Sequence, residues 1–123
     1  MTRERLALGE WGEELACRHL QGLGMKVLRR NYRTPVGEID IVARYRQLLI
    51  FIEVKTRRGS GFGAPQEAVG THKQRQIIRA AQWYLQREKI DSLQPRFDVV
   101  AVLCQSDGQV DIQHLPNAFE LAN

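Results

Sequence analysis

The nine residues Leu48–Thr56 constrain the fold of this 123-residue chain more than any other segment. Side chains of an extended strand alternate between its two faces, and here both faces are apolar as far as Ile52. A strand that is apolar on both faces is a central strand, covered on both sides. The segment therefore predicts the middle of a sheet with further structure packed against each face.

Charged side chains appear abruptly at the end of this strand. Glu53 and Lys55 lie two residues apart and share a face. The preceding apolar run, Gly37–Ala43, carries Glu38 and Asp40 with the same spacing. If the two runs pair, three carboxylates and one ammonium group converge. Carboxylates are natural Mg²⁺ ligands, and a lysine beside the metal can orient or deprotonate water, as in metal-assisted phosphodiester hydrolysis.

Two structural alternatives account for the same charges. Alternating charge along a strand is typical of a solvated face. A Glu53–Lys55 ion pair can also satisfy itself without any ligand, although it leaves Glu38 and Asp40 without a purpose. Burying a carboxylate at the edge of the core costs free energy unless the carboxylate is paired or bound to a metal. The spacing is therefore compatible with a metal site and with an ion pair.

The distribution of charge gives a second indication. Between Lys26 and Arg79 lie twelve Lys and Arg but four Asp and Glu, and three of those four are the acids described above. The candidate ligands thus lie in a positive surround, which suits a polyanion such as nucleic acid. Arginines on strand ends and helices are equally compatible with an ordinary solvated surface.

Length and composition favour a single domain over residues 1–123. No stretch reaches the length of a membrane span, and no apolar signal core follows the first residues. Cys17 and Cys104 lack metal-type spacing and fit reduced thiols. We therefore expect a cytoplasmic protein that does not enter a membrane.

Hydrophobic periodicity predicts the order α-β-β-β-α-β-β. On the first helix, Trp11 and His19 belong to the apolar stripe, and His19 is read as a core histidine. A glycine-rich loop is expected over Arg57–Pro65. The order predicts an α/β fold, a mixed β-sheet flanked by α-helices, with the strand at Phe97 parallel to the preceding one. The expected elements are helices over Arg5–Gln21 and from an N-cap at Thr71 to about Glu88, and strands over Met25–Asn31, Gly37–Ala43, Leu48–Thr56, Phe97–Leu103 and Val110–Leu115.

Basic residues near the candidate site are the expected contacts to nucleic acid. Lys73 and Arg75 occupy the first turn of the second helix, where a side chain can reach a phosphate. Arg33, Arg57 and Arg58 are the further candidates. Basic residues on a helix face are more often simply solvated, so these assignments depend on the metal site.

Several segments together resemble the PD-(D/E)xK, or restriction-endonuclease-like, nuclease superfamily. The order and spacing of these segments are similar to those of archaeal-type Holliday-junction resolvases. The chain resembles most closely the YraN-type family of uncharacterised bacterial proteins. The resemblance covers roughly residues 5–103. The matching segments are Gly9–Ala16, Asn31–Arg33, Gly37–Ala43, Phe51–Arg57, Phe62–Pro65, Glu67–Val69 and Lys73.

The resemblance implies a restriction-endonuclease-like fold and specific roles. Asp40 and Glu53 would bind Mg²⁺ or Mn²⁺, with the Val54 carbonyl as a further ligand. Lys55 would position or activate water, and Glu13 would complete the site from the first helix. The superfamily's proline before the first acid is replaced by Ile39. Glu38 belongs to the narrower family's pattern and is a candidate metal ligand.

Three hypotheses follow for function. The first is a Mg²⁺- or Mn²⁺-dependent nuclease acting on DNA, with branched or repair intermediates as substrates. Since junction-type nucleases cut two strands, the resemblance also implies that the protein could act as a homodimer. The second is a nucleic-acid-binding module with no catalytic activity in isolation. The third is a protein-interaction subunit whose carboxylates form a structural salt-bridge cluster.

Overall fold

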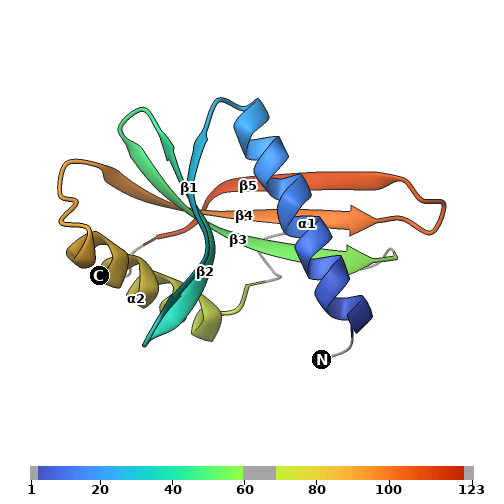
Figure 1. Ribbon diagram of the computed structural model, residues 1–123, viewed down its shortest axis with the longest axis horizontal. Helices are drawn as coiled ribbons and strands as arrows, with labels where there is room; N and C mark the ends of the chain where they lie inside the picture. The colour runs from blue at the N-terminus through green and yellow to red at the C-terminus, as the bar shows by residue number, and fades with distance from the viewer. Residues whose placement is uncertain (1–2, 60–68, 121–123) are drawn as a thin grey trace.

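A computed structural model describes residues 3–59 and 69–120 (Figure 1). Its elements follow the predicted order. They are α1 (Arg3–Gly22), β1 (Lys26–Thr34), β2 (Gly37–Tyr45), β3 (Leu48–Arg58), α2 (Thr71–Arg87), β4 (Gln94–Cys104) and β5 (Val110–Phe119). The predicted α/β fold, a mixed sheet flanked by helices, is confirmed.

The strands form one five-stranded sheet whose spatial order, β1-β2-β3-β4-β5, equals their order in the chain. Neighbours are antiparallel except β3 and β4, which run parallel from the Leu48–Gln94 pair to the Arg58–Cys104 pair. The parallel pairing predicted for the strand at Phe97 is therefore confirmed. β3 lies at the centre, as its two apolar faces require.

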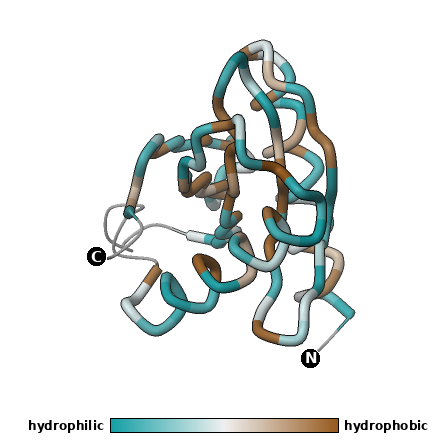
Figure 2. The backbone as a smooth tube through the Cα atoms, turned by 90° about the vertical axis from the view of Figure 1, so that its left-hand side faces the viewer, coloured by the Kyte–Doolittle hydropathy of each residue, from teal (hydrophilic) through white to brown (hydrophobic). Residues whose placement is uncertain are grey.

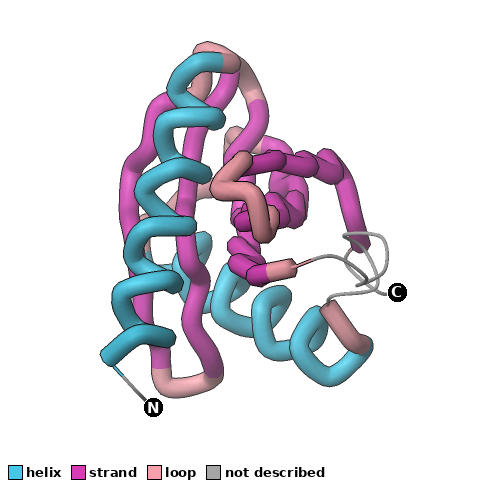
Figure 3. Tube along the Cα trace, turned by 90° about the vertical axis from the view of Figure 1, so that its right-hand side faces the viewer, coloured by secondary structure: helices cyan, strands magenta, loops and turns pink. Residues whose placement is uncertain are grey.

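The helices cover opposite faces of the sheet, and Figures 1 and 3 show them lying apart with strands between them. On the α2 face, Leu49 and Phe51 of β3 join a cluster with Tyr84. On the α1 face, Ile50 and Ile52 pack with a second cluster. All four β3 side chains are at most 1% exposed. Figure 2 shows hydrophobic positions alternating with hydrophilic ones along the tube.

A glycine allows α1 to lie close against β3. A Cβ atom added at Gly12 would overlap the Thr56 hydroxyl of β3. The absence of a side chain therefore sets the distance between this turn of the helix and the end of the central strand. This contact determines where the first turns of α1 lie relative to the charged end of β3.

A polar cluster ties the C-terminal half of α1 to the last two strands. Asp98 is fully buried and accepts two hydrogen bonds of 2.9 Å from Arg96 and one of 2.8 Å from His114 Nε2. The backbone N–H of Asn117 also donates to Asp98, at 3.0 Å. The other ring nitrogen of His114 lies 3.2 Å from His19 Nε2. His19, predicted as a core histidine, is thus half-buried and hydrogen-bonded.

Several element ends differ from the sequence prediction. β1 continues to Thr34, so the turn to β2 is confined to residues 35 and 36. The N-cap of α2 is Gly70 rather than Thr71, and no side chain caps it. Trp11 is 37% exposed instead of buried. Periodicity marks the side of a helix but not where the sheet beneath it ends. The loop predicted over Arg57–Pro65 lies mostly outside the described residues.

Candidate active site

The candidate site begins where β2 and β3 separate. Their last paired residues are Ile41 and Ile52, so Asp40 and Glu53 come directly after the final rung of the ladder. Beyond it, the Asp40 carboxylate accepts a 2.8 Å hydrogen bond from the Val54 N–H. The N–H and C=O of one strand residue point to the same edge, so the Val54 carbonyl faces this opening too.

Glu53 is a buried carboxylate flanked by two lysines. Its side chain is 6% exposed, and its Oε1 atom lies 3.7 Å from Lys55 Nζ and 4.0 Å from Lys73 Nζ. Lys55 comes from the same strand, whereas Lys73 comes from the first turn of α2. These distances are long for direct hydrogen bonds, so the two ammonium groups compensate the charge without saturating the carboxylate.

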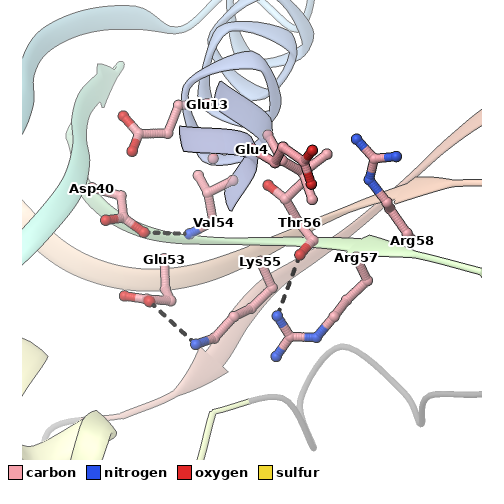
Figure 4. Close-up of a pocket in the computed structure, with 11 residues that line it drawn as sticks. Glu4, Glu13, Asp40, Glu53, Val54, Lys55, Thr56, Arg57 and Arg58 are labelled. Carbon is pink, nitrogen blue, oxygen red and sulfur yellow. Dashed lines mark hydrogen bonds and ion pairs between the residues drawn. The ribbon is translucent and has the colours of Figure 1, made fainter. Parts of the chain in front are cut away.

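The third carboxylate comes from α1. Glu13 extends from the helix toward Asp40, while Glu53 lies beyond Asp40 on the other side of β3 (Figure 4). Its Oε1 atom is buried and has no hydrogen-bond partner among the residues that the structure describes. An unsatisfied buried carboxylate oxygen is unfavourable, and such atoms are commonly explained by a missing ligand, water or ion.

Burial and mutual repulsion make all three carboxylates harder to ionise. Burial raises the pKa of Glu53 to about 7, and the nearby Asp40 contributes in the same direction. Burial likewise raises the pKa of Asp40, against the opposing effect of the Val54 hydrogen bond. Burial followed by the charge of Asp40 raises the pKa of Glu13. A divalent cation would relieve this repulsion directly.

These groups line an open pocket, here called the carboxylate pocket, of about 780 Å³. Figure 4 shows Asp40 and Glu53 at one end and Glu4 and Arg58 at the other. Its lining residues are Glu4, Leu8, Gly9, Glu13, Asp40, Glu53, Val54, Lys55, Thr56, Arg57 and Arg58. The pocket thus joins an acidic end to a basic rim, and it is large enough for a small ligand or part of a polymer.

The donors present suit a hard cation bound with water. Within residues 3–59 and 69–120, no three His, Cys, Asp or Glu side chains form a ready-made ligand cluster. Mg²⁺ does not require one, since it keeps several waters and binds through one or two carboxylates. Asp40, Glu53 and the Val54 carbonyl supply that number of oxygen donors, and the unpartnered Glu13 oxygen can accept from bound water.

Comparison with known proteins places the chain in a family. Residues 12–102 match the family described as Uncharacterised protein family UPF0102. The chain belongs to this family. A UPF0102 protein of Syntrophotalea carbinolica is 60% identical over 121 residues, 98% of each chain. A second, from Geobacter sulfurreducens, is 48% identical over 94% of this chain and 90% of its own. A third, from Rhodococcus opacus, is 45% identical over 93% and 97%. The resemblance to the YraN-type family is confirmed.

Within this UPF0102 chain, the residues predicted as ligands separate into two groups. Asp40, Glu53 and Val54 all line the carboxylate pocket. Glu38 does not join them: its side chain is 53% exposed and lies 3.7 Å from Arg33, outside the pocket lining. The regular alternation expected for β2 is interrupted, because Ile39 packs on the α2 face and Ile41 on the α1 face. Glu38 and Asp40 therefore do not converge.

The predicted basic contacts also separate by position. Arg57 and Arg58 line the pocket, and Lys73 stands beside Glu53 rather than on the open surface. Arg33, on β1, is 84% exposed and lies outside the pocket lining. Arg75 is exposed on α2 and is also absent from the lining.

Sequence reasoning missed the part of the pocket that the first turns of α1 supply. Glu4, Leu8 and Gly9 line it but carry no recognisable catalytic pattern. Gly12 in the middle of a helix was the available signal, since a glycine there is unfavourable unless something packs closely against it.

None of the described helices is long and apolar enough to cross a membrane. Cys17 and Cys104 are free cysteines, the first buried and the second half-buried.

Proposed function

We propose that this protein is a Mg²⁺- or Mn²⁺-dependent nuclease that hydrolyses phosphodiester bonds in DNA. The observation that carries the proposal is the convergence of Glu13, Asp40 and Glu53 on one open pocket beside Lys55. Burial and neighbouring charges disfavour the ionised form of each carboxylate. A cation bound in the pocket would stabilise these ionised forms.

The metal would be held by Asp40, Glu53 and the Val54 carbonyl. When bound, it would supply Lewis-acid stabilisation of the phosphate charge and lower the pKa of a bound water. Lys55, at the pocket and close to Glu53, would orient the attacking water and hold a positive charge near the phosphate. Glu13 would accept a hydrogen bond from water on the α1 side.

Two further features support a nucleic-acid substrate. Arg57 and Arg58 follow Lys55 along β3 and form a basic rim on the pocket, where a phosphate backbone can lie. The order of the motifs also resembles the PD-(D/E)xK nucleases, whose restriction-endonuclease-like fold combines a mixed sheet with flanking helices. The resemblance favours DNA, including branched or repair intermediates, and a homodimer that cuts two strands.

The test is cleavage of labelled single-stranded, duplex, flapped and four-way-junction DNAs with Mn²⁺. Asp40→Asn is the inactive control, because it removes a metal-binding charge but keeps an oxygen for the Val54 N–H. Cleavage of one structure that is lost in the variant supports the proposal. Equal cleavage by wild type and variant would exclude the assigned site.

A nucleic-acid-binding module without chemistry is the second candidate. It is favoured by one observation: Lys55 and Lys73 lie beside the Glu53 carboxylate and compensate its charge without a metal. A Mn²⁺ titration separates the two candidates. Absence of a Mn²⁺ site, together with DNA binding that weakens with salt, would favour the module.

A further inference from the structure

A second, smaller pocket adjoins the carboxylate pocket. Its volume is about 310 Å³, and it lies between the first turns of α1 and the ends of the parallel strands β3 and β4. Glu4, Leu8 and Arg58 line both pockets. This second pocket, here called the Trp11 pocket, is completed by Ala7, Trp11 and Cys104.

The helix side of the Trp11 pocket is one continuous face of α1. Its residues stand at positions 4, 7, 8 and 11, the i, i+3, i+4, i+7 spacing that places side chains on the same side of a helix. Trp11, a residue that is 37% exposed, ends this face. A large aromatic side chain left partly exposed beside a pocket favours a role in binding over a role in the core.

The charges around the Trp11 pocket indicate how a nucleotide would be oriented. Arg58 stands on the shared rim, with Arg57 preceding it on β3, so a backbone phosphate is favoured there. Glu4 lies on the other part of the shared rim and repels phosphate. The apolar, aromatic interior therefore suits the base of a nucleotide, while its phosphate lies at Arg58.

We propose that the Trp11 pocket holds an unpaired nucleobase stacked on Trp11, from a strand whose backbone passes Arg58 toward the carboxylate pocket. This inference rests on the proposed function and narrows its substrate. A base inside a regular duplex is stacked and paired and has to be unstacked first. The site therefore selects nucleic acid that is single-stranded, or that carries unpaired nucleotides beside the bond to be cut. Stacking of this kind is tolerant of sequence.

The chain offers a matched control for testing this proposal. Trp83, on α2 at the other face of the sheet, is 36% exposed and so almost equal to Trp11 in exposure. The chain has two tryptophans, so one substitution isolates the fluorescence of the other. The tryptophan fluorescence of the Trp83→Phe variant comes from Trp11, and that of the Trp11→Phe variant comes from Trp83. Both variants are made in the Asp40→Asn background and titrated in EDTA with an oligothymidylate and with a blunt duplex. Saturation is followed independently by the anisotropy of a label on the DNA.

We expect the single strand to quench Trp11 and to leave Trp83 unchanged. Trp11→Ala should weaken single-strand affinity roughly tenfold with little effect on duplex affinity, and Trp11→Phe should restore most of the loss. Unchanged Trp11 emission at saturation would overturn the proposal. So would an equal loss of affinity for both DNAs in Trp11→Ala.

The readouts keep this proposal distinct from the proposed function. Stacking is measured without metal and without cleavage, whereas nuclease activity is measured as Mn²⁺-dependent cleavage. Cleavage without a Trp11 response would reject the stacking site alone. A Trp11 response without cleavage would support the stacking site and reject the nuclease.

Discussion

The Asp40 side chain takes the place of a β-strand partner for Val54, accepting its N–H at 2.8 Å directly after the β2–β3 ladder ends. A carboxylate that completes a sheet edge in this way is fixed in position before any ligand arrives. The opening between the two strands and the Asp40 carboxylate that lines it therefore have the same structural origin.

The first prediction separates these two roles of Asp40. Asp40→Asn keeps an acceptor for Val54 and should change the free energy of unfolding by less than about 1 kcal/mol, while abolishing cleavage. Asp40→Ala leaves the Val54 N–H without a partner and should lower the free energy of unfolding by about 1–3 kcal/mol. Urea denaturation of both variants provides the comparison. Equal stability of the two would contradict the structural role.

The second prediction concerns the pH dependence of stability through Glu53. Its pKa, about 7 in the folded protein, lies above the ordinary glutamate value of 4.5. The folded state therefore binds a proton more tightly than the unfolded state, and this stabilisation, present below about pH 4.5, is lost as pH rises through 7. The shift corresponds to on the order of 3 kcal/mol.

Glu53→Gln removes this dependence. In EDTA at pH 8, the variant should be more stable than the wild type, and the difference should vanish toward pH 4.5. Denaturation curves between pH 4 and 8 measure it, with the exposed α1 residue Glu10, changed to Gln, as control. A Glu53→Gln protein that is less stable than wild type at pH 8 would refute the assignment. Saturating Mg²⁺ should reduce the difference by stabilising the wild type.

The third prediction tests the close approach of α1 to β3. Gly12→Ala places a Cβ atom against the Thr56 hydroxyl and should destabilise the protein by about 1–3 kcal/mol. Gly9→Ala, one turn earlier, meets no atom of the described residues within 4 Å. It should be neutral or stabilise by up to about 1 kcal/mol, because alanine favours helix. Thermal unfolding of the pair distinguishes them, and an equal effect of both changes would rule out the contact.

The fourth prediction concerns the buried cluster around Asp98. Burial alone would raise the pKa of Asp98, but hydrogen bonds from His114 and Arg96 outweigh it and hold the pKa below its usual range. Its contribution to stability is therefore present above the unfolded-state pKa and is lost as pH falls through the lower, folded-state value.

Asp98→Ala should cost about 3–5 kcal/mol, because it leaves the part-buried Arg96 without its charge partner. The loss should be largest near neutral pH and smaller in strong acid. Guanidinium denaturation at pH 7 and pH 3 measures it. Asp107→Ala, in the exposed turn before β5, serves as the control. A loss for Asp98→Ala no larger than that of the control would show that the cluster is not stabilising.

Much of this architecture was predictable because buried positions recur along the sequence as a periodic pattern of apolar residues. Two apolar faces on β3 predicted a central strand, and the charged residues that follow predicted Asp40 and Glu53 at one site. The position of Glu38 outside the carboxylate pocket was not predictable, since it depends on where the β2–β3 pairing stops. Nor was the exposure of Trp11, which depends on how far α1 extends past the strands beneath it. Both depend on tertiary geometry that alternation along one element does not encode.

The agreement between strand order and chain order also bears on how the molecule folds. Three of the four strand pairings join consecutive strands as antiparallel neighbours, and only β3 and β4 need a crossover through α2. Pairing across that longer segment carries the larger loop-closure entropy, so we expect it to form late. The same segment brings Lys73 to Glu53. The charge balance around Glu53 should thus be completed at the end of folding, and partly folded chains should carry Glu53 with Lys55 beside it but without Lys73.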